Sequence, residues 1–137
     1  AYIEDVAKKV GVQALINSVE EDFGGIDILV NHAAVEPHVY LLEMDEWDWH
    51  RTLDVNLTGA FLMIQSAGRV MKEKGKGKIL NIVAGSGKGV AYRSSMAGLR
   101  ALSQSADLEL SPQGIRVRTI ENSADVVKDV MSALEVK

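Results

Sequence analysis

Hydrophobic positions along the chain follow two periods in turn, one typical of helices and one of buried strands. In residues 12–23 apolar side chains recur about every 3.6 positions and the pattern stops at Gly24 and Gly25, which predicts an amphipathic helix. The next segment, IDILVNHAA, is a short apolar run rich in β-branched residues, as in a strand buried on both faces of a parallel sheet. We therefore expect a helix followed by a buried strand.

The same alternation recurs in the remainder of the chain. A long helix is predicted from Asp45, which suits an N-cap, to the lysines of MKEKGKGK, which suit a helix C-terminus. After it, the sequence predicts a strand in KILNIVAG, a long helix in SSMAGLRALSQSADLELSPQG, a strand in IRVRTI and a short helix in ADVVKDVMSAL. Strands that alternate with long helices predict an α/β fold with helices on both faces of the sheet.

Composition narrows the class of protein. The 137 residues are 47% hydrophobic, which is typical of one globular domain, and the net charge of −4 argues against a nucleic-acid partner. The chain has no cysteine, which fits a reducing compartment, so we expect a cytoplasmic location. The longest apolar runs are far shorter than the roughly 20 residues that span a membrane, and no membrane partner is expected. The spacing of His32, His38 and His50 fits no metal site.

Four motifs follow one another along most of the chain: DILVNHAA, LDVNLTGAF, KILNIVAG and YRSSMAGLRALSQSADLELSPQGIRVRTI. In this order they resemble the short-chain dehydrogenase/reductase family. There, the corresponding segments are a strand ending in Asn-Asn-Ala-Gly, the active-site asparagine segment, the serine strand, and the Tyr-x-x-x-Lys helix with the sixth strand. The resemblance implies a partial Rossmann-like, doubly wound three-layer sandwich with a mostly parallel sheet.

The resemblance also implies an activity and the residues that perform it. The family transfers hydride between NAD or NADP and a small-molecule carbonyl or alcohol, while the protein exchanges a proton with the substrate oxygen. The resemblance implies Asn56, Ser86 and Tyr92 as the catalytic residues: Asn56 and Tyr92 match the motifs directly, with Asn56 anchoring a water on a proton path, and Ser86 is the hydroxyl nearest to the family's serine position. The matching cofactor-binding residues are Asp5 and Val6, beside the adenine, with Asn31 and Ala33 at the strand end.

Two positions depart from the catalytic pattern. A tyrosine has a pKa of about 10, and a cation four residues later on the same helix face lowers it by favouring phenolate. Here that position is Met96, so Tyr92 is either a catalytic residue without its cation or an ordinary helix residue. Ala84 occupies the place of the family's serine, and the nearest hydroxyl, Ser86, either replaces it or belongs to a surface turn.

The glycine-rich turn that holds the cofactor diphosphate in the family has no counterpart in this sequence. We therefore expect residues 1–137 to form a single Rossmann-like domain whose N-terminal βαβ half is largely absent. In relatives the missing strands cover one side of the DILVN strand, so its apolar edge needs another cover. Three covers are conceivable: residues 2–5, another chain, or a longer natural polypeptide.

Two hypotheses follow from these features. The first is an oxidoreductase of the short-chain family, weak or inactive as this chain because Met96, Ala84 and the missing turn affect both catalysis and cofactor binding. The second is a non-catalytic relative that serves assembly or partner binding. The family associates through its two long helices, so we expect a homodimer or tetramer in which the contact residues are Phe61, Ile64, Leu99 and Leu102.

Overall fold

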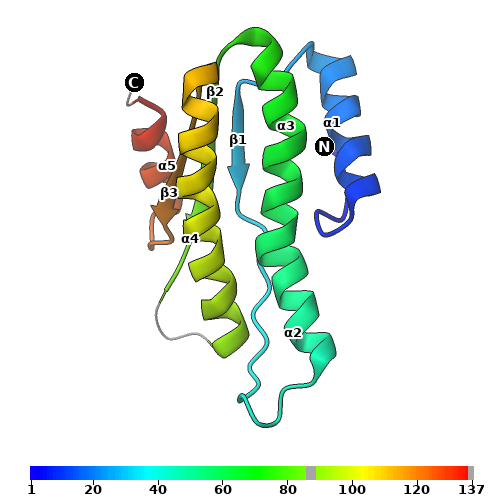
Figure 1. Cartoon of the computed structure of the whole chain (residues 1–137), viewed down its shortest axis with the longest axis vertical. Coiled ribbons are helices and arrows are strands. Elements are labelled where there is room, and N and C mark those ends of the chain that lie inside the picture. Colours follow the sequence, from blue (N-terminus) through cyan, green and yellow to red (C-terminus); the bar gives the residue numbers. More distant parts are fainter. Residues whose placement is uncertain (86–88, 136–137) are drawn as a thin grey trace.

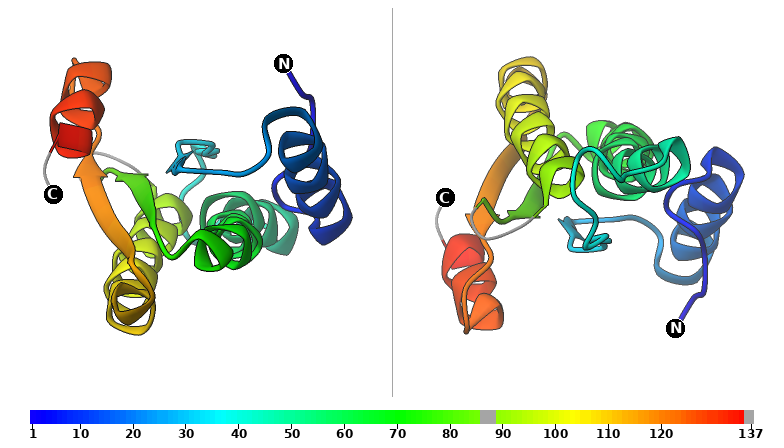
Figure 2. Two further views of the ribbon diagram at one scale, coloured as in Figure 1. Left: turned by 90° about the horizontal axis from the view of Figure 1, so that it is seen from above. Right: turned by 90° about the horizontal axis from the view of Figure 1, so that it is seen from below.

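The computed structural model describes residues 1–85 and 89–135 and contains, in those ranges, a three-stranded parallel sheet of order β1-β2-β3. Figure 1 shows helices α3 and α4 side by side across the sheet, and Figure 2 shows α5 on the opposite face. The elements, in chain order, are α1 (Lys9–Phe23), β1 (Ile28–Asn31), α2 (Glu46–Leu53), a π-helical turn η1 (Asp54–Thr58), α3 (Gly59–Lys74), β2 (Gly77–Val83), α4 (Val90–Leu110), a 3₁₀ turn η2 (Ser111–Gln113), β3 (Ile115–Glu121) and α5 (Val126–Glu135). The predicted α/β fold with a parallel sheet is confirmed.

Local sequence signals set two of the helix ends. Helix α1 stops at Gly24, which has a φ of 77° and whose N–H donates to the Glu20 carbonyl. A left-handed φ of this kind carries little cost for glycine, so the predicted end of the helix is confirmed. Helix α2 begins after Asp45, whose Oδ1 accepts a hydrogen bond of 2.8 Å from the Asp48 N–H, as expected of an N-cap.

The predicted long helix after Asp45 is confirmed from residue 46 to residue 74, with one change of hydrogen-bond pattern inside it. The π-helical turn η1 separates α2 from α3. Such a turn inserts an extra residue into the helical ladder and occurs often at functional sites. Here it carries the buried Asn56, whose side chain bonds to a neighbouring loop. A hydrophobic period does not reveal a single inserted residue, which explains why the pattern indicated a continuous helix.

A ladder of polar side chains, starting at the half-buried Asn31 and continuing through the buried Asn81 and Ser103, crosses the sheet to α4. Asn31 lies opposite Asn81 in the pairing of β1 with β2, and its Nδ2 donates to Asn81 Oδ1 at 2.8 Å. Asn81 Nδ2 donates in turn to Ser103 Oγ at 2.8 Å, and this hydroxyl donates to the Leu99 carbonyl at 2.7 Å. Because each buried polar group in the ladder is paired, no desolvation penalty remains uncompensated.

Strand β1, which lies at one edge of the sheet among the described strands, carries apolar side chains that remain accessible on one face. Ile28 is 47% exposed and Val30 is 40% exposed. Residues 2–5 form no strand along this edge; the Tyr2 hydroxyl instead donates a hydrogen bond to the Asp22 carboxylate on α1. Of the three conceivable covers, residues 2–5 are therefore not the one observed.

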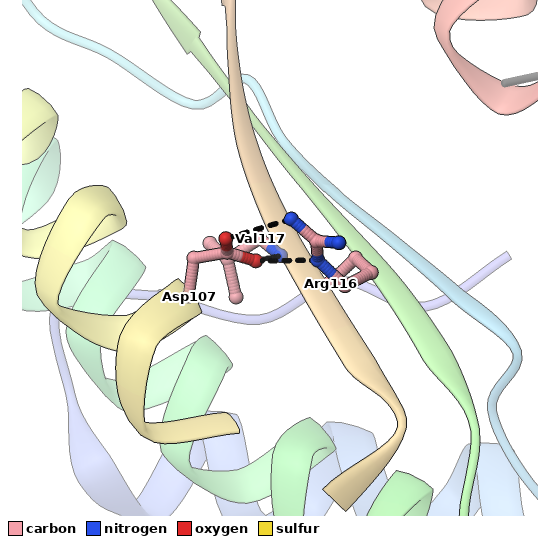
Figure 3. Close-up of polar contacts among 3 residues, drawn as sticks. All are labelled: Asp107, Arg116 and Val117. Atoms are coloured by element: carbon pink, nitrogen blue, oxygen red, sulfur yellow. Dashed lines mark hydrogen bonds and ion pairs between the residues drawn. The ribbon is translucent and has the colours of Figure 1, made fainter. Parts of the chain in front are cut away.

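Asp107, near the end of α4, joins that helix to β3. Arg116 donates from Nε to Asp107 Oδ1 and from Nη2 to Oδ2, both at 2.9 Å, and the Val117 N–H donates to Oδ1 at 2.8 Å (Figure 3). The hydrogen bond from Arg116 is the main reason that the pKa of Asp107 lies below its ordinary value, and the Val117 N–H adds to it against the opposing effect of burial. This Asp107–Arg116–Val117 clamp holds α4 against the last strand.

The clamp predicts a specific loss of stability in acid. Because the folded-state pKa of Asp107 is lowered, its contribution is complete above the unfolded pKa of about 3.9 and is lost as pH falls through the folded value. In urea unfolding between pH 7 and pH 2.5, Asp107→Asn is expected to be less stable than the unaltered chain at pH 7, and the difference should shrink toward the acid end. Asp27→Asn is the matched control, since that side chain is 69% exposed and lies 3.9 Å from Lys74 Nζ. A difference between Asp107→Asn and the unaltered chain that does not vary with pH would contradict this account.

Candidate functional site

Asn56 closes the loop that follows β1 onto the helical layer. Its Oδ1 accepts from the Val35 N–H at 2.7 Å, while its Nδ2 donates to the Val35 carbonyl at 2.9 Å and to Ser95 Oγ at 3.1 Å. The residue is buried, only 1% exposed. Both amide hydrogens are used, so only acceptor capacity on Oδ1 remains for a water.

Ser95 connects Asn56 with the tyrosine segment. Its buried hydroxyl donates to the Tyr92 carbonyl at 2.6 Å while it accepts from Asn56. The sequence interpretation did not assign Ser95 a role. The available signal was its position three residues after Tyr92, which places both on one helix face. Hydrogen bonds thus run without a break from the Val35 backbone through Asn56 and Ser95 to the backbone of Tyr92.

Tyr92 and Met96 lie on the same face of α4, as the four-residue spacing predicts. Both belong to a buried apolar cluster with Val83 and Leu99, and Met96 is only 2% exposed. The position that holds a lysine in the family therefore lies in the apolar interior of this chain. The nearby guanidinium of Arg100 pairs instead with Glu121, at 2.6 Å.

Two residues were considered for the place of the family's serine after β2: Ala84, which matches its position, and Ser86, the nearest hydroxyl. Ala84 is partly buried and packs against the same apolar cluster as Met96, so it offers no hydroxyl at the end of β2. Ser86, the predicted substitute, lies outside the described residues. Its catalytic role stays a prediction.

A cavity of about 230 Å³ lies at the carboxyl end of β1, where open α/β sheets bind their ligands. Three of the four predicted cofactor residues, Val6, Asn31 and Ala33, line it together with Asn56. His32 also lines it, directly after β1. The remaining lining residues are mainly apolar: Leu15, Val30, Val55, Gly59, Ala60, Met63, Ile82 and Leu99.

The fourth predicted cofactor residue, Asp5, is not among the lining residues. Its Oδ1 accepts from the Ala7 N–H at 3.0 Å, and its Oδ2 lies 3.6 Å from Arg51 Nη1. Beside it, Val6 approaches helix α3 so closely that a Cβ at Gly59 would lie 3.1 Å from the Val6 carbonyl oxygen. Glycine at residue 59 is therefore what lets this loop form one wall of the cavity.

The cavity residues fit one part of a nicotinamide dinucleotide. An apolar cavity with two amide side chains suits a nucleoside, whose base is flat and whose ribose carries hydroxyls. The volume of about 230 Å³ is below the roughly 300 Å³ at which cofactor sites begin. Among the described residues that line it, none is lysine or arginine. The described cavity therefore suits the nucleoside end and provides no cationic side chain for the diphosphate.

A groove of about 490 Å³ runs between α3 and α4 on the outer side of the helical layer. Phe61, which is 43% exposed, and the partly buried Leu102 line it, as the predicted helix contact requires. Ile64 also lines the groove, although most of its side chain is buried in the main core. Leu99 does not line it, because this residue packs inside the cluster around Tyr92.

Comparison with known proteins identifies the family. The sequence model of the short chain dehydrogenase family matches residues 1–128, and the chain belongs to this family. It is 40% identical over 121 residues to D-threitol dehydrogenase of Mycolicibacterium smegmatis, covering 85% of this chain and 46% of that protein. It is 37% identical over 121 residues to the 3-alpha-(or 20-beta)-hydroxysteroid dehydrogenase of Mycobacterium tuberculosis, with the same coverage of 85% and 46%. The chain thus spans about half the length of these curated relatives.

Solved structures confirm the Rossmann-like fold of this family. NAD⁺-bound xylitol dehydrogenase superposes with a TM-score of 0.83 and 32% identity, covering 88% of this chain and 48% of that one. A gluconate 5-dehydrogenase from Burkholderia cenocepacia, in complex with NADP and tartrate, superposes with a TM-score of 0.81 and 31% identity, covering 85% and 48%. In the described part of the chain, no helix is both long and apolar enough to cross a membrane.

Proposed function

We propose that this chain carries the tyrosine segment and the nucleoside end of the cofactor site of a short-chain oxidoreductase. The enzyme would use NAD or NADP and act on a small-molecule carbonyl or alcohol. The observation that carries the proposal is the cavity at the end of β1, where Val6, Asn31, Ala33 and Asn56 meet. The hydrogen bonds from Asn56 through Ser95 link this cavity to the Tyr92 segment.

The same geometry supports the proposal that this chain alone has little or no reductase activity. Met96 places an apolar side chain at the position where the family's Tyr-x-x-x-Lys pattern has a lysine. In residues 1–85 and 89–135, the cavity has no cationic lining residue that could meet the diphosphate. The chain should therefore bind NADH no more tightly than adenosine.

Titration of the purified 137-residue chain with adenosine and with NADH tests both parts of the proposal. Both ligands should bind with similar dissociation constants of about 1 mM, since the diphosphate and nicotinamide find few partners. Ala33→Leu, which narrows the cavity, should weaken both, while Ala97→Leu on the exposed face of α4 should change neither. Micromolar binding of NADH would contradict the proposed loss of cofactor affinity. Adenosine affinity that is unchanged by Ala33→Leu would show that adenosine does not bind in this cavity.

A non-catalytic role in assembly is the second candidate, favoured by the groove between α3 and α4. Phe61 and Leu102 present apolar surface there, and a second copy related by two-fold symmetry could bury it. Phe61→Glu should abolish a dimer seen by sedimentation velocity. Phe23→Glu, at a 74% exposed position on α1, is the matched control and should leave the dimer intact. A monomeric unaltered chain at about 100 μM would remove this candidate.

A further inference from the structure

The hydroxyl of Ser95, which is buried on α4, joins two segments that lie far apart in the sequence. Its Oγ donates to the Tyr92 carbonyl at 2.6 Å and accepts from Asn56 Nδ2 at 3.1 Å. A serine hydroxyl has one proton, and here the Tyr92 carbonyl receives it. Ser95 can therefore only accept from Asn56, and the direction of this hydrogen bond is fixed.

The Asn56 amide has one orientation in which all its partners are matched. Its Oδ1 accepts from the Val35 N–H at 2.7 Å, and its Nδ2 donates to the Val35 carbonyl at 2.9 Å and to Ser95. With the amide reversed, Oδ1 would face two oxygens that have no proton to give, and Nδ2 would face the Val35 N–H. Val35 on the loop and Ser95 on α4 therefore hold the same side chain in the same orientation.

On the other side of Ser95, the Tyr92 carbonyl belongs to the first turn of α4. The helix begins at Val90 after Gly89, which has no side chain that could cap this turn. In an α-helix the carbonyl of residue 92 accepts from the N–H of Met96, so the Ser95 hydroxyl uses the second lone pair of the same oxygen. Ser95 thus bonds to the atom that links the tyrosine to the position four residues later.

A second contact brings the loop after β1 against the start of α4. A Cβ at Gly89 would lie 3.2 Å from the Pro37 carbonyl oxygen, and Figure 1 shows the loop beside the first turns of α4. This loop continues from Ala33, which lines the cavity at the end of β1. The chain segment that borders the cavity therefore meets the tyrosine turn both at Pro37 and through the bonds of Asn56.

We propose that Ser95 is a positioning residue of the candidate site, which holds the Tyr92 turn of α4 in one place relative to the loop after β1. A ligand in the cavity that contacts Asn56 then changes the surroundings of the Tyr92 carbonyl through the Ser95 hydroxyl. The part that concerns a ligand rests on the proposed function, whereas the role of the hydroxyl in holding the loop does not need a ligand.

Ser103 is a matched serine on the same helix. Its buried Oγ donates to the Leu99 carbonyl at 2.7 Å and accepts from Asn81 Nδ2 at 2.8 Å. Both serines thus bond to the backbone of α4 and accept from an asparagine. Ser103 differs in that its asparagine lies on β2 and not in the turn that holds the loop.

Hydrogen exchange of the Val35 amide, divided by that of the Lys78 amide, separates positioning from a general loss of stability. The Lys78 N–H donates to the Asp27 carbonyl at 3.0 Å, at the start of β2, so global unfolding accelerates both amides. In Ser95→Ala the ratio should rise about fivefold, as expected for the loss of one buried hydrogen bond.

Two further variants test the hydroxyl and its place on the helix. Ser95→Thr keeps a hydroxyl that can bond to a carbonyl in the preceding turn, so the exchange ratio should return to that of the unaltered chain. Ser103→Ala removes the matched serine and should leave the ratio unchanged.

Adenosine tests the effect of a ligand on Tyr92. At about 5 mM adenosine, above the expected dissociation constant, the ¹³C resonance of the Tyr92 carbonyl should shift in the unaltered chain and in Ser95→Thr. It should not shift in Ser95→Ala, although the Ala33 amide reports binding in all three. If the Ala33 amide does not shift in the unaltered chain, the proposed function is wrong, and the exchange ratio still decides the role of Ser95.

An unchanged exchange ratio in a folded Ser95→Ala chain would overturn the proposal, as would an equal rise in Ser103→Ala. If Ser95→Ala does not fold, the unaltered chain decides. The Asn56 Nδ2 proton that faces Ser95 should exchange at least about tenfold more slowly than the side-chain amide of Asn17, which is exposed. Exchange at the rate of Asn17 would mean that Ser95 does not hold the asparagine.

Discussion

Met96→Lys, which restores the family's Tyr-x-x-x-Lys pattern, is expected to destabilise this chain by about 3 kcal/mol. Met96 is 2% exposed and packs with Val83, Tyr92 and Leu99. An ammonium at that position loses its hydration, and the cluster contains no carboxylate to pair with it. The main expected effect of the substitution is therefore the cost of burying a cation in an apolar interior, and not an effect on Tyr92.

Urea unfolding measures the expected loss as a lower midpoint at an unchanged slope. Ala97→Lys is the matched control, because residue 97 is adjacent on α4 and exposed, and its effect should stay within about 0.5 kcal/mol. NADH affinity should not improve in Met96→Lys, since the cavity still lacks a cationic group for the diphosphate. Recovery of micromolar NADH binding by this one change would refute our account of the site.

Asn56→Ala is expected to cost a similar amount, about 3 kcal/mol, through hydrogen bonds rather than packing. The substitution removes three bonds and leaves both the N–H and the carbonyl of Val35 without their partner in a partly buried loop. It also removes the hydrogen bonds that the side chain of residue 56, in the π-helical turn η1, makes inside the fold. The loop after β1 should then separate from the helical layer.

Hydrogen exchange of the Val35 amide measures this separation directly and should accelerate in Asn56→Ala, alongside a lower urea midpoint. Asn17→Ala is the control, since Asn17 is exposed and accepts only from the Gln13 side chain. Its effect should remain within about 0.5 kcal/mol. If Val35 exchanges equally fast in the unaltered chain and in Asn56→Ala, the asparagine does not hold the loop.

Hydrophobic periodicity and the residues that end or cap helices predicted most of the fold, because these signals act over short distances along the chain. Gly24 ends α1 through its own φ, and Asp45 caps α2 through a neighbour three residues away. The inward orientation of Leu99 was not predictable in the same way. Which face of α4 is buried depends on where the sheet lies, and the helical period alone gives several apolar positions from which to choose.

The candidate site was predicted in part, because a motif names residues without giving their partners. Val6, Asn31 and Ala33, which the motif match named, line one cavity, and their role in cofactor binding stays a prediction. It did not indicate Ser95 or the backbone of Val35, since both reach Asn56 only through the folding of distant segments. The Asp107–Arg116–Val117 clamp was missed for the same reason, because helix and strand geometry bring its members together.

The polar ladder through Asn31, Asn81 and Ser103 has a consequence for the fidelity of folding. A slip of β1 by one residue would set Asn31 beside Leu80 or Ile82, which are buried and apolar, and would turn its amide to the other face of the sheet. The amides of Asn31 and Asn81 would both lose a partner, at about 1–3 kcal/mol each. A sheet held by aliphatic side chains alone tolerates several alignments, whereas this pair of asparagines makes the misaligned ones measurably less stable.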